Sequence, residues 1–263
     1  HLVVMDVDST LIQDEVIELL AAEAGCLDEV ARVTQAAMRG DLDFAQEILN
    51  AALAGLDRAQ RLLPTQLASQ VHFRIYAYGT ARDLQSTLQR SGRSWIAAHA
   101  DPDLGMLMVS LPPGPDQSLE IERQVPHELM HLMLYQHLGS RYRSLPTWYQ
   151  EGLASLNELY PTPEYPLLLS DAFRSGSLIP MLDLCSGFPR TASSAILAYA
   201  QSAAFVGYLQ QQYGSNGITA LAQQYGDGLG CEPGAQAALG QPLSRLERDW
   251  LESTFVGESW QDR

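Results

Sequence analysis

The order of the secondary-structure patterns along the chain is the feature that most constrains its fold. Helical periodicity dominates from Leu119 onward, whereas a helix pattern at 80–92 lies among strand patterns. Strand patterns occur at 2–7, 71–79, 94–100 and 105–114. Later helices are predicted at about 119–138, 147–159, 164–175, 194–213, 216–225 and 243–254. Strands followed by helices predict an α+β fold: a small mixed sheet, then a mostly helical C-terminal part.

A polar stretch at residues 40–43 is the candidate domain boundary. It separates helical patterns at 14–25 and 28–38 from an amphipathic one at 44–63. Residues 1–44 also hold ten acidic side chains against only two arginines, so the charge is uneven along the chain. We therefore predict a head at 1–43 and a larger domain at 44–263.

Composition excludes some classes of partner. The formal net charge is −15, and none of the 16 basic residues is a lysine. Nucleic acids and anionic membranes are bound through clustered Lys and Arg, so neither is expected as a partner. No apolar run approaches the about 20 residues of a membrane-spanning helix, and the start lacks a signal-peptide pattern. We expect a globular protein without a membrane span, whose compartment and oligomeric state stay open.

Three cysteines, at 26, 185 and 231, lack the spacing of a metal cluster. The interpretation we favour is three unpaired, small core residues. The alternative is a disulfide between Cys185 and Cys231, which would require an oxidising compartment.

The helix predicted after Pro126 carries the sequence HELMH, from His127 to His131. Residues four apart lie about 40° apart around a helix, so both imidazoles project from one face and can reach one ion. Glu128 lies beside them, placed to contact a metal-activated water rather than the metal. The alternative is that these three side chains lie on a helix surface, where their polar groups hydrogen-bond to solvent.

A tetrahedral catalytic zinc site has three protein ligands, so the two imidazoles leave one ligand unassigned. Glu151, in WYQEGLAS on the next predicted helix, can supply it and leave the fourth position for water. Gly152 and Ala154 are small, as expected where one helix approaches another closely.

This segment, about 44–255, resembles the gluzincin metallopeptidases and, within them, the peptidase MA-like group. The resemblance implies a zincin-like fold, with a peptide or protein substrate antiparallel to the edge strand, for which we expect residues 105–110. It implies one Zn²⁺ held by His127, His131 and Glu151. Glu128 would be the general base of an endopeptidase, taking the proton of the attacking water and passing it to the leaving amine.

The same resemblance suggests further site residues. Related peptidases often draw a tyrosine from a later helix as oxyanion donor, and Tyr199 is the candidate. The alternative is a core aromatic residue in a stripe with Phe205 and Tyr208. Several gluzincins orient a histidine with a carboxylate four residues after the glutamate ligand; Ser155 stands there, and Glu158 could substitute. Peptidases of this kind are often exported or membrane-tethered.

Residues 1–44, with DVDST after an apolar strand, resemble the start of bacterial phosphoserine phosphatase of the haloacid dehalogenase superfamily. The resemblance implies a strand–helix fragment of a Rossmann-like fold. In that family Asp6 would be the nucleophile and Asp8 the general acid/base. A Mg²⁺ ion would bridge Asp6 and the phosphate, and Glu15 would bind the substrate amine. The family also uses a lysine to offset phosphate charge, and this chain has none. We therefore expect a truncated, non-catalytic head, whose strand pairs with the other sheet, pairs with another chain or stays poorly ordered.

Three functional hypotheses follow. The leading one is a zinc metallopeptidase. The second is a phosphoserine phosphatase-like, Mg²⁺-dependent hydrolase that uses Asp6 and Asp8. The third is a catalytically inactive, zinc-stabilised module that binds peptides in the same groove.

Overall fold

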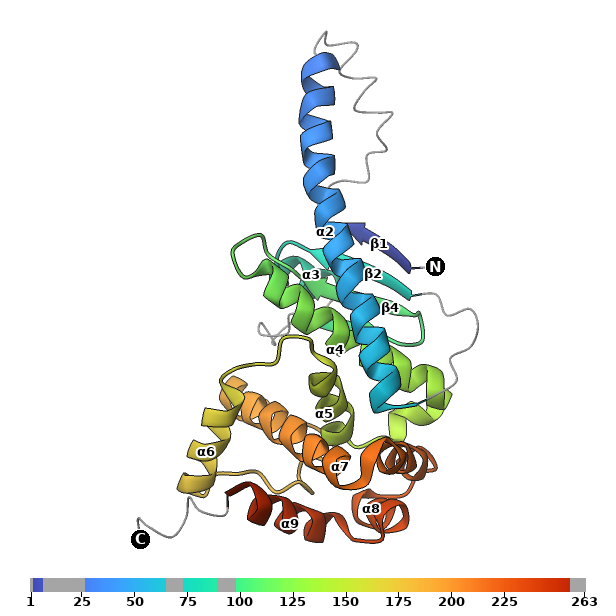
Figure 1. Cartoon of the computed structure of the whole chain (residues 1–263), viewed down its shortest axis with the longest axis vertical. Helices are drawn as coiled ribbons and strands as arrows, with labels where there is room; N and C mark the ends of the chain where they lie inside the picture. Colours follow the sequence, from blue (N-terminus) through green and yellow to red (C-terminus); the bar gives the residue numbers. More distant parts are fainter. Residues whose placement is uncertain (1, 7–26, 65–72, 89–97, 256–263) are drawn as a thin grey trace.

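The computed structural model describes residues 2–6, 27–64, 73–88 and 98–255 (Figure 1). Among these residues a small sheet and its covering helices form one end of the domain, and a helical part forms the other. The elements in chain order are β1 (Leu2–Asp6), α2 (Leu27–Leu62), β2 (Phe73–Tyr78), α3 (Ala81–Thr87), β3 (Ala98–Asp101), β4 (Met106–Ser110), α4 (Gln117–Leu138), the 3-10 helix η1 (Gly139–Ser144), α5 (Thr147–Asn157), α6 (Tyr165–Ser175), α7 (Ala192–Gly226), α8 (Cys231–Leu239) and α9 (Leu243–Phe255). The α+β prediction is confirmed.

The sheet of the described residues has the order β1-β2-β4-β3. β1 and β4 run parallel to β2, and β3 pairs antiparallel with β4. The prediction that 105–110 forms the edge strand is therefore wrong, because β4 lies inside the sheet and β3 lies at its edge. The near-continuous apolar run of β4 is the signal that was missed, since a strand buried on both faces needs no polar alternation.

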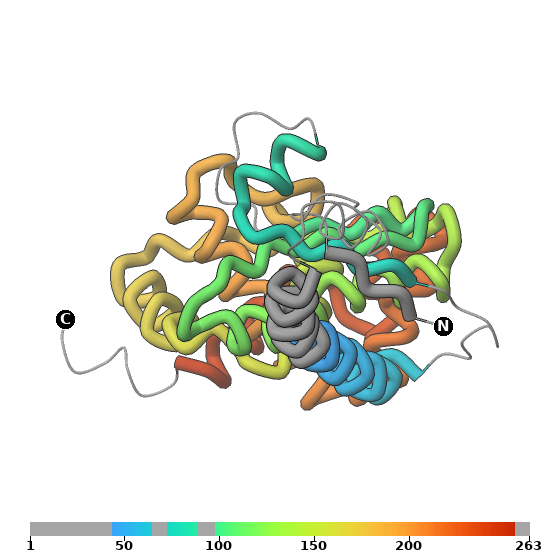
Figure 2. The backbone as a smooth tube through the Cα atoms, turned by 90° about the horizontal axis from the view of Figure 1, so that it is seen from above, coloured from blue at the N-terminus to red at the C-terminus, as the bar shows by residue number. Residues whose placement is uncertain are grey.

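The two faces of the sheet pack against different helices. Ile75, Leu107 and Val109 belong to the main core, which α2 and α4 complete. Tyr78 and Met108, which alternate with them, form a smaller cluster with Leu84 of α3. Figure 2 shows α2 and α3 on opposite sides of the strands. Helix α4 packs against β4 and the edge strand β3.

The N-terminal strand joins the same sheet. β1 pairs with β2 from Leu2↔Phe73 to Asp6↔Ala77, so the first of the three expected outcomes is confirmed. The predicted break at 40–43 is wrong, because α2 runs through it; one glycine costs a helix only about 1 kcal/mol and does not have to end it. Asp8, Glu15 and Cys26 lie outside the described residues, and the division into two domains stays a prediction.

In the helical part, α5 packs between α4 and α7. The two helices predicted at 194–213 and 216–225 are one element, α7, kinked at Gly214, whose φ of 65° suits glycine. Helix α8 was not predicted from the sequence, because Pro233 and Gly234 weaken the helical pattern of CEPGAQAAL. Pro233 lies in the first turn of α8, where a missing N–H costs no helical bond. None of the described helices combines the length and apolar character needed to cross a bilayer.

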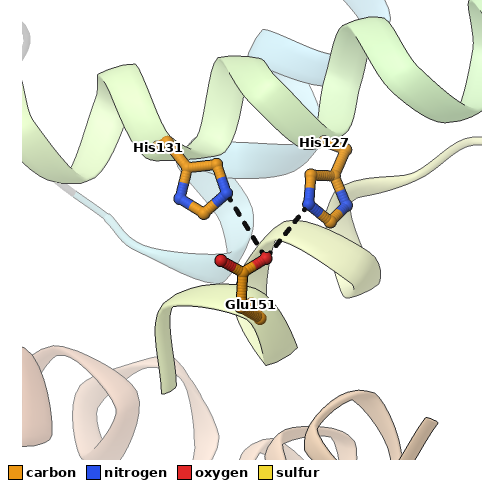
Figure 3. A group of neighbouring side chains, drawn as sticks. All are labelled: His127, His131 and Glu151. Atoms are coloured by element: carbon orange, nitrogen blue, oxygen red, sulfur yellow. Dashed lines mark ion pairs between the residues drawn. The ribbon is translucent and has the colours of Figure 1, made fainter. Parts of the chain in front are cut away.

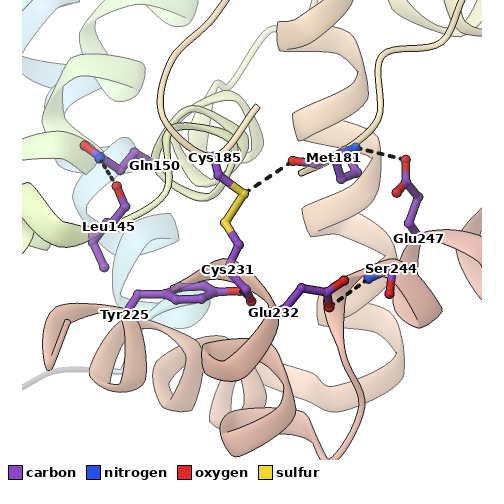
Figure 4. The surroundings of a disulfide bond; sticks show 9 residues. All are labelled: Leu145, Gln150, Met181, Cys185, Tyr225, Cys231, Glu232, Ser244 and Glu247. Carbon is purple, nitrogen blue, oxygen red and sulfur yellow. Dashed lines mark hydrogen bonds between the residues drawn. A yellow bond between two sulfur atoms is a disulfide. The ribbon is translucent and has the colours of Figure 1, made fainter. Parts of the chain in front are cut away.

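A disulfide joins Cys185 to Cys231, so the favoured interpretation of unpaired core cysteines is wrong for this pair (Figure 4). The bridge ties the loop before α7 to the first residue of α8. The same loop is bonded to the start of α5, because the Thr147 N–H donates to the Cys185 carbonyl at 3.0 Å. The disulfide therefore supports the helix that carries Glu151.

We expect replacement of both bridged cysteines by serine to lower the free energy of unfolding by about 4 kcal/mol, because a 46-residue loop is no longer closed in the unfolded chain. Urea unfolding followed by circular dichroism measures this difference. Cys26→Ser, which leaves the bridge intact, is the control. Equal stability of the double variant and the native chain would contradict the prediction.

Candidate metal centre

The two histidines of HELMH lie on one face of α4, as the spacing predicts. Their ring centroids are 5.4 Å apart. Leu129, Met130 and Met133 are buried in the main core and anchor the other faces of the helix. His131 is almost completely buried, and His127 is only slightly more exposed. The core thus fixes the direction in which both imidazoles point.

Glu151 projects from α5 toward both rings (Figure 3). Its Oε2 atom lies 3.4 Å from Nε2 of His127 and 3.7 Å from Nε2 of His131. These three residues form a group whose possible ligand atoms all lie within 4.8 Å of one another. The sequence prediction placed the three residues in one site, and the fold brings them together.

The two distances from the Glu151 oxygen to the histidine nitrogens are close to those around a tetrahedral metal ion. Zinc bonds to His nitrogen and carboxylate oxygen are about 2.0–2.2 Å long, which puts two tetrahedral ligands about 3.3–3.5 Å apart. The two distances to Glu151, 3.4 and 3.7 Å, lie at or slightly above this range. Two imidazoles with one carboxylate are also a donor set that zinc accepts while keeping one coordination position open.

Glu128 lies beside this group and is 8% exposed. Burial raises the pKa of its carboxyl group, and the neighbouring His131 and His127 offset this only in part. The main-chain N–H of Ala100 in the edge strand β3 also hydrogen-bonds to it. A buried carboxylate whose pKa is raised toward neutrality is suited to accept and return a proton.

The ion pairs shift the pKa of the potential ligands in opposite directions. Burial opposes the charged form of His127, but hydrogen bonds to Glu151 and Glu158 outweigh it and raise the His127 pKa well above its usual value. Burial would also raise the pKa of Glu151, yet His131 and His127 hold it well below the usual range. Glu151 is therefore ionised at neutral pH, as a metal ligand must be.

Each histidine has a second partner at its other ring nitrogen. Nδ1 of His127 lies 2.9 Å from Oε1 of Glu158, and Nδ1 of His131 lies 3.1 Å from the Tyr142 hydroxyl. An imidazole that binds a metal through Nε2 carries its proton on Nδ1. In that state the Nδ1–H group of each histidine would donate to the oxygen beside it, that of Glu158 or of Tyr142. Glu158 was named from the sequence as a substitute for the carboxylate missing at Ser155. Tyr142 was missed, because it lies on η1 and only the fold brings it to α4.

Tyr199 of α7 also faces the site. Its ring centroid lies 6.2 Å from that of His127, and Phe188 packs edge-on against the ring at 4.9 Å. Burial, the charges of Glu151 and Glu128 and a hydrogen bond to Glu151 raise the Tyr199 pKa well above its usual value. The hydroxyl therefore stays protonated and can donate a hydrogen bond.

Gly152, next to the candidate metal ligand Glu151, allows α5 to approach α7 closely. A Cβ atom on Gly152 would lie 2.5 Å from the Ser202 carbonyl oxygen and 2.5 Å from Val206 Cγ2. We expect Gly152→Ala to lower the free energy of unfolding by about 1–3 kcal/mol through overpacking. Thermal and urea unfolding would measure this. Gly114→Ala, where nothing lies within 4 Å, should change stability by less than about 0.5 kcal/mol. A stable Gly152→Ala variant would show that the two helices can move apart.

Comparison with curated proteins finds phosphoserine phosphatases. That of Streptomyces coelicolor is 56% identical over 94 residues, which are 35% of this chain and 21% of the relative. That of Streptococcus thermophilus is 47% identical over 91 residues, 35% of this chain and 40% of the relative. A probable phosphoserine phosphatase of Schizosaccharomyces pombe is 57% identical over 47 residues, 18% of this chain and 16% of the relative. The chain thus spans two fifths or less of these relatives.

The longer alignments exceed the 44 residues that the sequence motifs identified, so the phosphatase similarity extends beyond them. No solved structure matches the chain at a significant level. A family model, that of the peptidase MA superfamily, matches residues 51–256, a range that contains His127, His131 and Glu151. This match covers most of the sequence, and the chain belongs to the peptidase MA superfamily.

Proposed function

We propose that the protein is a zinc-dependent endopeptidase of the gluzincin type. The observation that carries this proposal is the convergence of Glu151 Oε2 on the two Nε2 atoms of HELMH, at 3.4 and 3.7 Å, with the carboxyl group of Glu128 buried beside them. Membership of the peptidase MA superfamily supports hydrolysis of the metallopeptidase kind. The antiparallel edge strand next to α4 is consistent with a zincin-like fold.

In this proposal His127, His131 and Glu151 hold the metal. A zinc ion held by these residues would supply Lewis acidity, which would activate the attacking water and polarise the scissile carbonyl. Glu128 accepts the proton of the attacking water at its carboxylate and returns it to the leaving amine. The edge strand β3 offers main-chain groups along which an extended peptide can pair.

Tyr199 is the proposed hydrogen-bond donor to the developing oxyanion. Because such a contact strengthens in the transition state, we expect Tyr199→Phe to lower kcat by about 10²–10³-fold with little change in KM. Steady-state kinetics on a fluorogenic peptide measure this. Tyr208→Phe, further along α7, is the control and should retain kcat. A native kcat in Tyr199→Phe would assign the donor to another group.

Zinc analysis combined with hydrolysis of an unstructured protein tests the proposed function. We expect about one zinc per chain and internal cleavage products by mass spectrometry. Release of single terminal residues would instead indicate an exopeptidase. Zinc with tight peptide binding but no turnover would favour the inactive peptide-binding module. A metal-free chain without hydrolysis would overturn the proposal.

The phosphatase similarity favours a second candidate function for the N-terminal part, a Mg²⁺-dependent phosphohydrolase. We propose instead that residues 1–43 are a non-catalytic head, whose strand β1 belongs to the same sheet as the peptidase part. Asp6 ends β1, whereas Asp8 lies outside the described residues. If the head were active, the chain would release phosphate from phosphoserine with Mg²⁺, and Asp6→Asn would abolish this. We expect no such release.

The disulfide between Cys185 and Cys231 supports an oxidising compartment for the peptidase part.

A further inference from the structure

The disulfide between Cys185 and Cys231 joins a loop to a rigid anchor (Figure 4). Cys231 begins α8, and its carbonyl oxygen accepts a hydrogen bond of 3.3 Å from the hydroxyl group of the buried Tyr225. In the loop, Leu184 is fully buried in the main core, and its carbonyl oxygen accepts the Trp148 N–H at the start of α5. The bridge therefore ties down the residue that directly follows this buried leucine.

Residues 186–191 lead from the bridge to α7. Among the described residues, no hydrogen bond or ion pair involves 186–190. Phe188, in the middle of this segment, is partly buried against the main core and packs edge-on against the Tyr199 ring at 4.9 Å. The Tyr199 ring in turn lies 6.2 Å from that of His127. The disulfide and the packing of Phe188 thus hold this segment beside the candidate metal centre.

The bridge is open to reduction. Both cysteines are only partly buried, so a small reductant can approach the two sulfur atoms. A dithiol would give up two electrons and two protons and become a disulfide itself, while Cys185 and Cys231 become thiols. The segment after Cys185 would then gain conformational freedom, because only the packing of Phe188 would still hold it.

We propose that the disulfide is a redox-sensitive control of turnover, which acts through Phe188 on Tyr199, the proposed oxyanion donor. The inference rests on the proposed zinc function. With the bridge closed, Phe188 limits the motion of the Tyr199 ring; with the bridge open, the hydroxyl is less well fixed where the oxyanion develops. Phe188 is a positioning residue, because it acts only through Tyr199.

The metal should stay bound when the bridge opens. Its proposed ligands lie on α4 and α5, and the start of α5 stays bonded to the buried Leu184. Reduction is therefore expected to separate two properties of the site, lowering the rate of turnover and leaving zinc in place. Full turnover would then require the oxidised form of the chain.

Steady-state kinetics of the native chain before and after reduction test the inference. The reductant is a phosphine, which takes up oxygen from water as it opens the bridge, because a thiol would compete for zinc. We expect kcat to fall by about 2–10-fold, the effect that one edge-on aromatic contact can have on a rate. KM and zinc content should not change, and reoxidation should restore kcat. The assays are run below the Tm of the reduced chain, so that a folded protein is measured.

Variants of the aromatic pair locate the effect. Phe188→Ala should lower kcat of the oxidised chain by the same factor, and reduction should add nothing to it, because both changes act through one contact. Phe188→Leu keeps an apolar side chain against Tyr199 and should lose less. The variant with both bridged cysteines replaced by serine, which the phosphine cannot alter, is the control for the reagent.

Phe173→Ala is the matched control for stability. It removes a stacked ring contact with Phe255 in a separate apolar cluster, so it should lower Tm and leave both kcat and its response to reduction native. An unchanged kcat in the reduced, folded chain would overturn the inference. Loss of zinc on reduction would also overturn it, as would equal effects of reduction in the native chain and in Phe188→Ala. An oxidised native chain that hydrolyses no peptide would instead overturn the proposed function.

Discussion

Glu128→Gln is expected to lower kcat for peptide hydrolysis by about 10²–10⁴-fold while the chain retains about one zinc. The amide has nearly the same shape as the carboxyl group but cannot accept the proton of the attacking water. It lies beside the proposed ligands without being one of them, so the metal stays bound. Steady-state kinetics and zinc analysis on the same preparation measure both quantities.

Glu122→Gln is the control for this change, because Glu122 lies on the same helix with an exposed side chain. It should retain both zinc and kcat. Full activity in Glu128→Gln would contradict the assignment of the general base. A loss of zinc in Glu128→Gln would instead show that this carboxyl group holds the metal.

Glu151→Ala is expected to weaken zinc binding by more than about 100-fold. Loss of a residue that merely supports a ligand already costs about 10–100-fold, and Glu151 is proposed as a direct ligand. Zinc that binds only the folded chain raises its stability, by about 4 kcal/mol at a concentration of 1,000 Kd. We therefore expect zinc to raise the Tm of the native chain and to leave that of Glu151→Ala almost unchanged.

Scanning calorimetry with added zinc, and again after chelation by EDTA, measures this difference. Glu164→Ala, an exposed acidic position before α6, should keep the full zinc-dependent rise in Tm. Persistence of that rise in Glu151→Ala would show that zinc binds elsewhere, and the proposed ligand set would then be wrong.

Local patterns in the sequence were reliable where the interactions are themselves local. The helix that carries HELMH was predicted at 119–138 and extends from Gln117 to Leu138. Thr80, the first residue of the pattern at 80–92, caps α3, since its hydroxyl oxygen accepts the Asp83 N–H. Helical periodicity and capping depend on residues three or four apart, which a sequence displays directly.

Predictions that required the neighbours of a strand or a cysteine were wrong. The expected edge strand lies inside the sheet, because strand order depends on which segments pair and not on the strand's own residues. Cys185 and Cys231 were expected to stay unpaired, yet folding brings positions 46 residues apart into a disulfide. Neither spacing nor composition contains this information.

For the metal centre, residue types and spacing were enough to predict the candidate ligands, which are two histidines one helical turn apart and a glutamate on the next helix, with Glu128 between the histidines as the candidate base. How these groups are held depends on contacts that form only on folding. Folding put Tyr142 against His131, and it bonded Asn157 and Leu159 to the carbonyls of Pro126 and Glu122 in α4. The two kinds of interaction differ in the separation along the chain over which they act. Helix periodicity places the histidines, whereas contacts between elements far apart in the chain form only when the core packs.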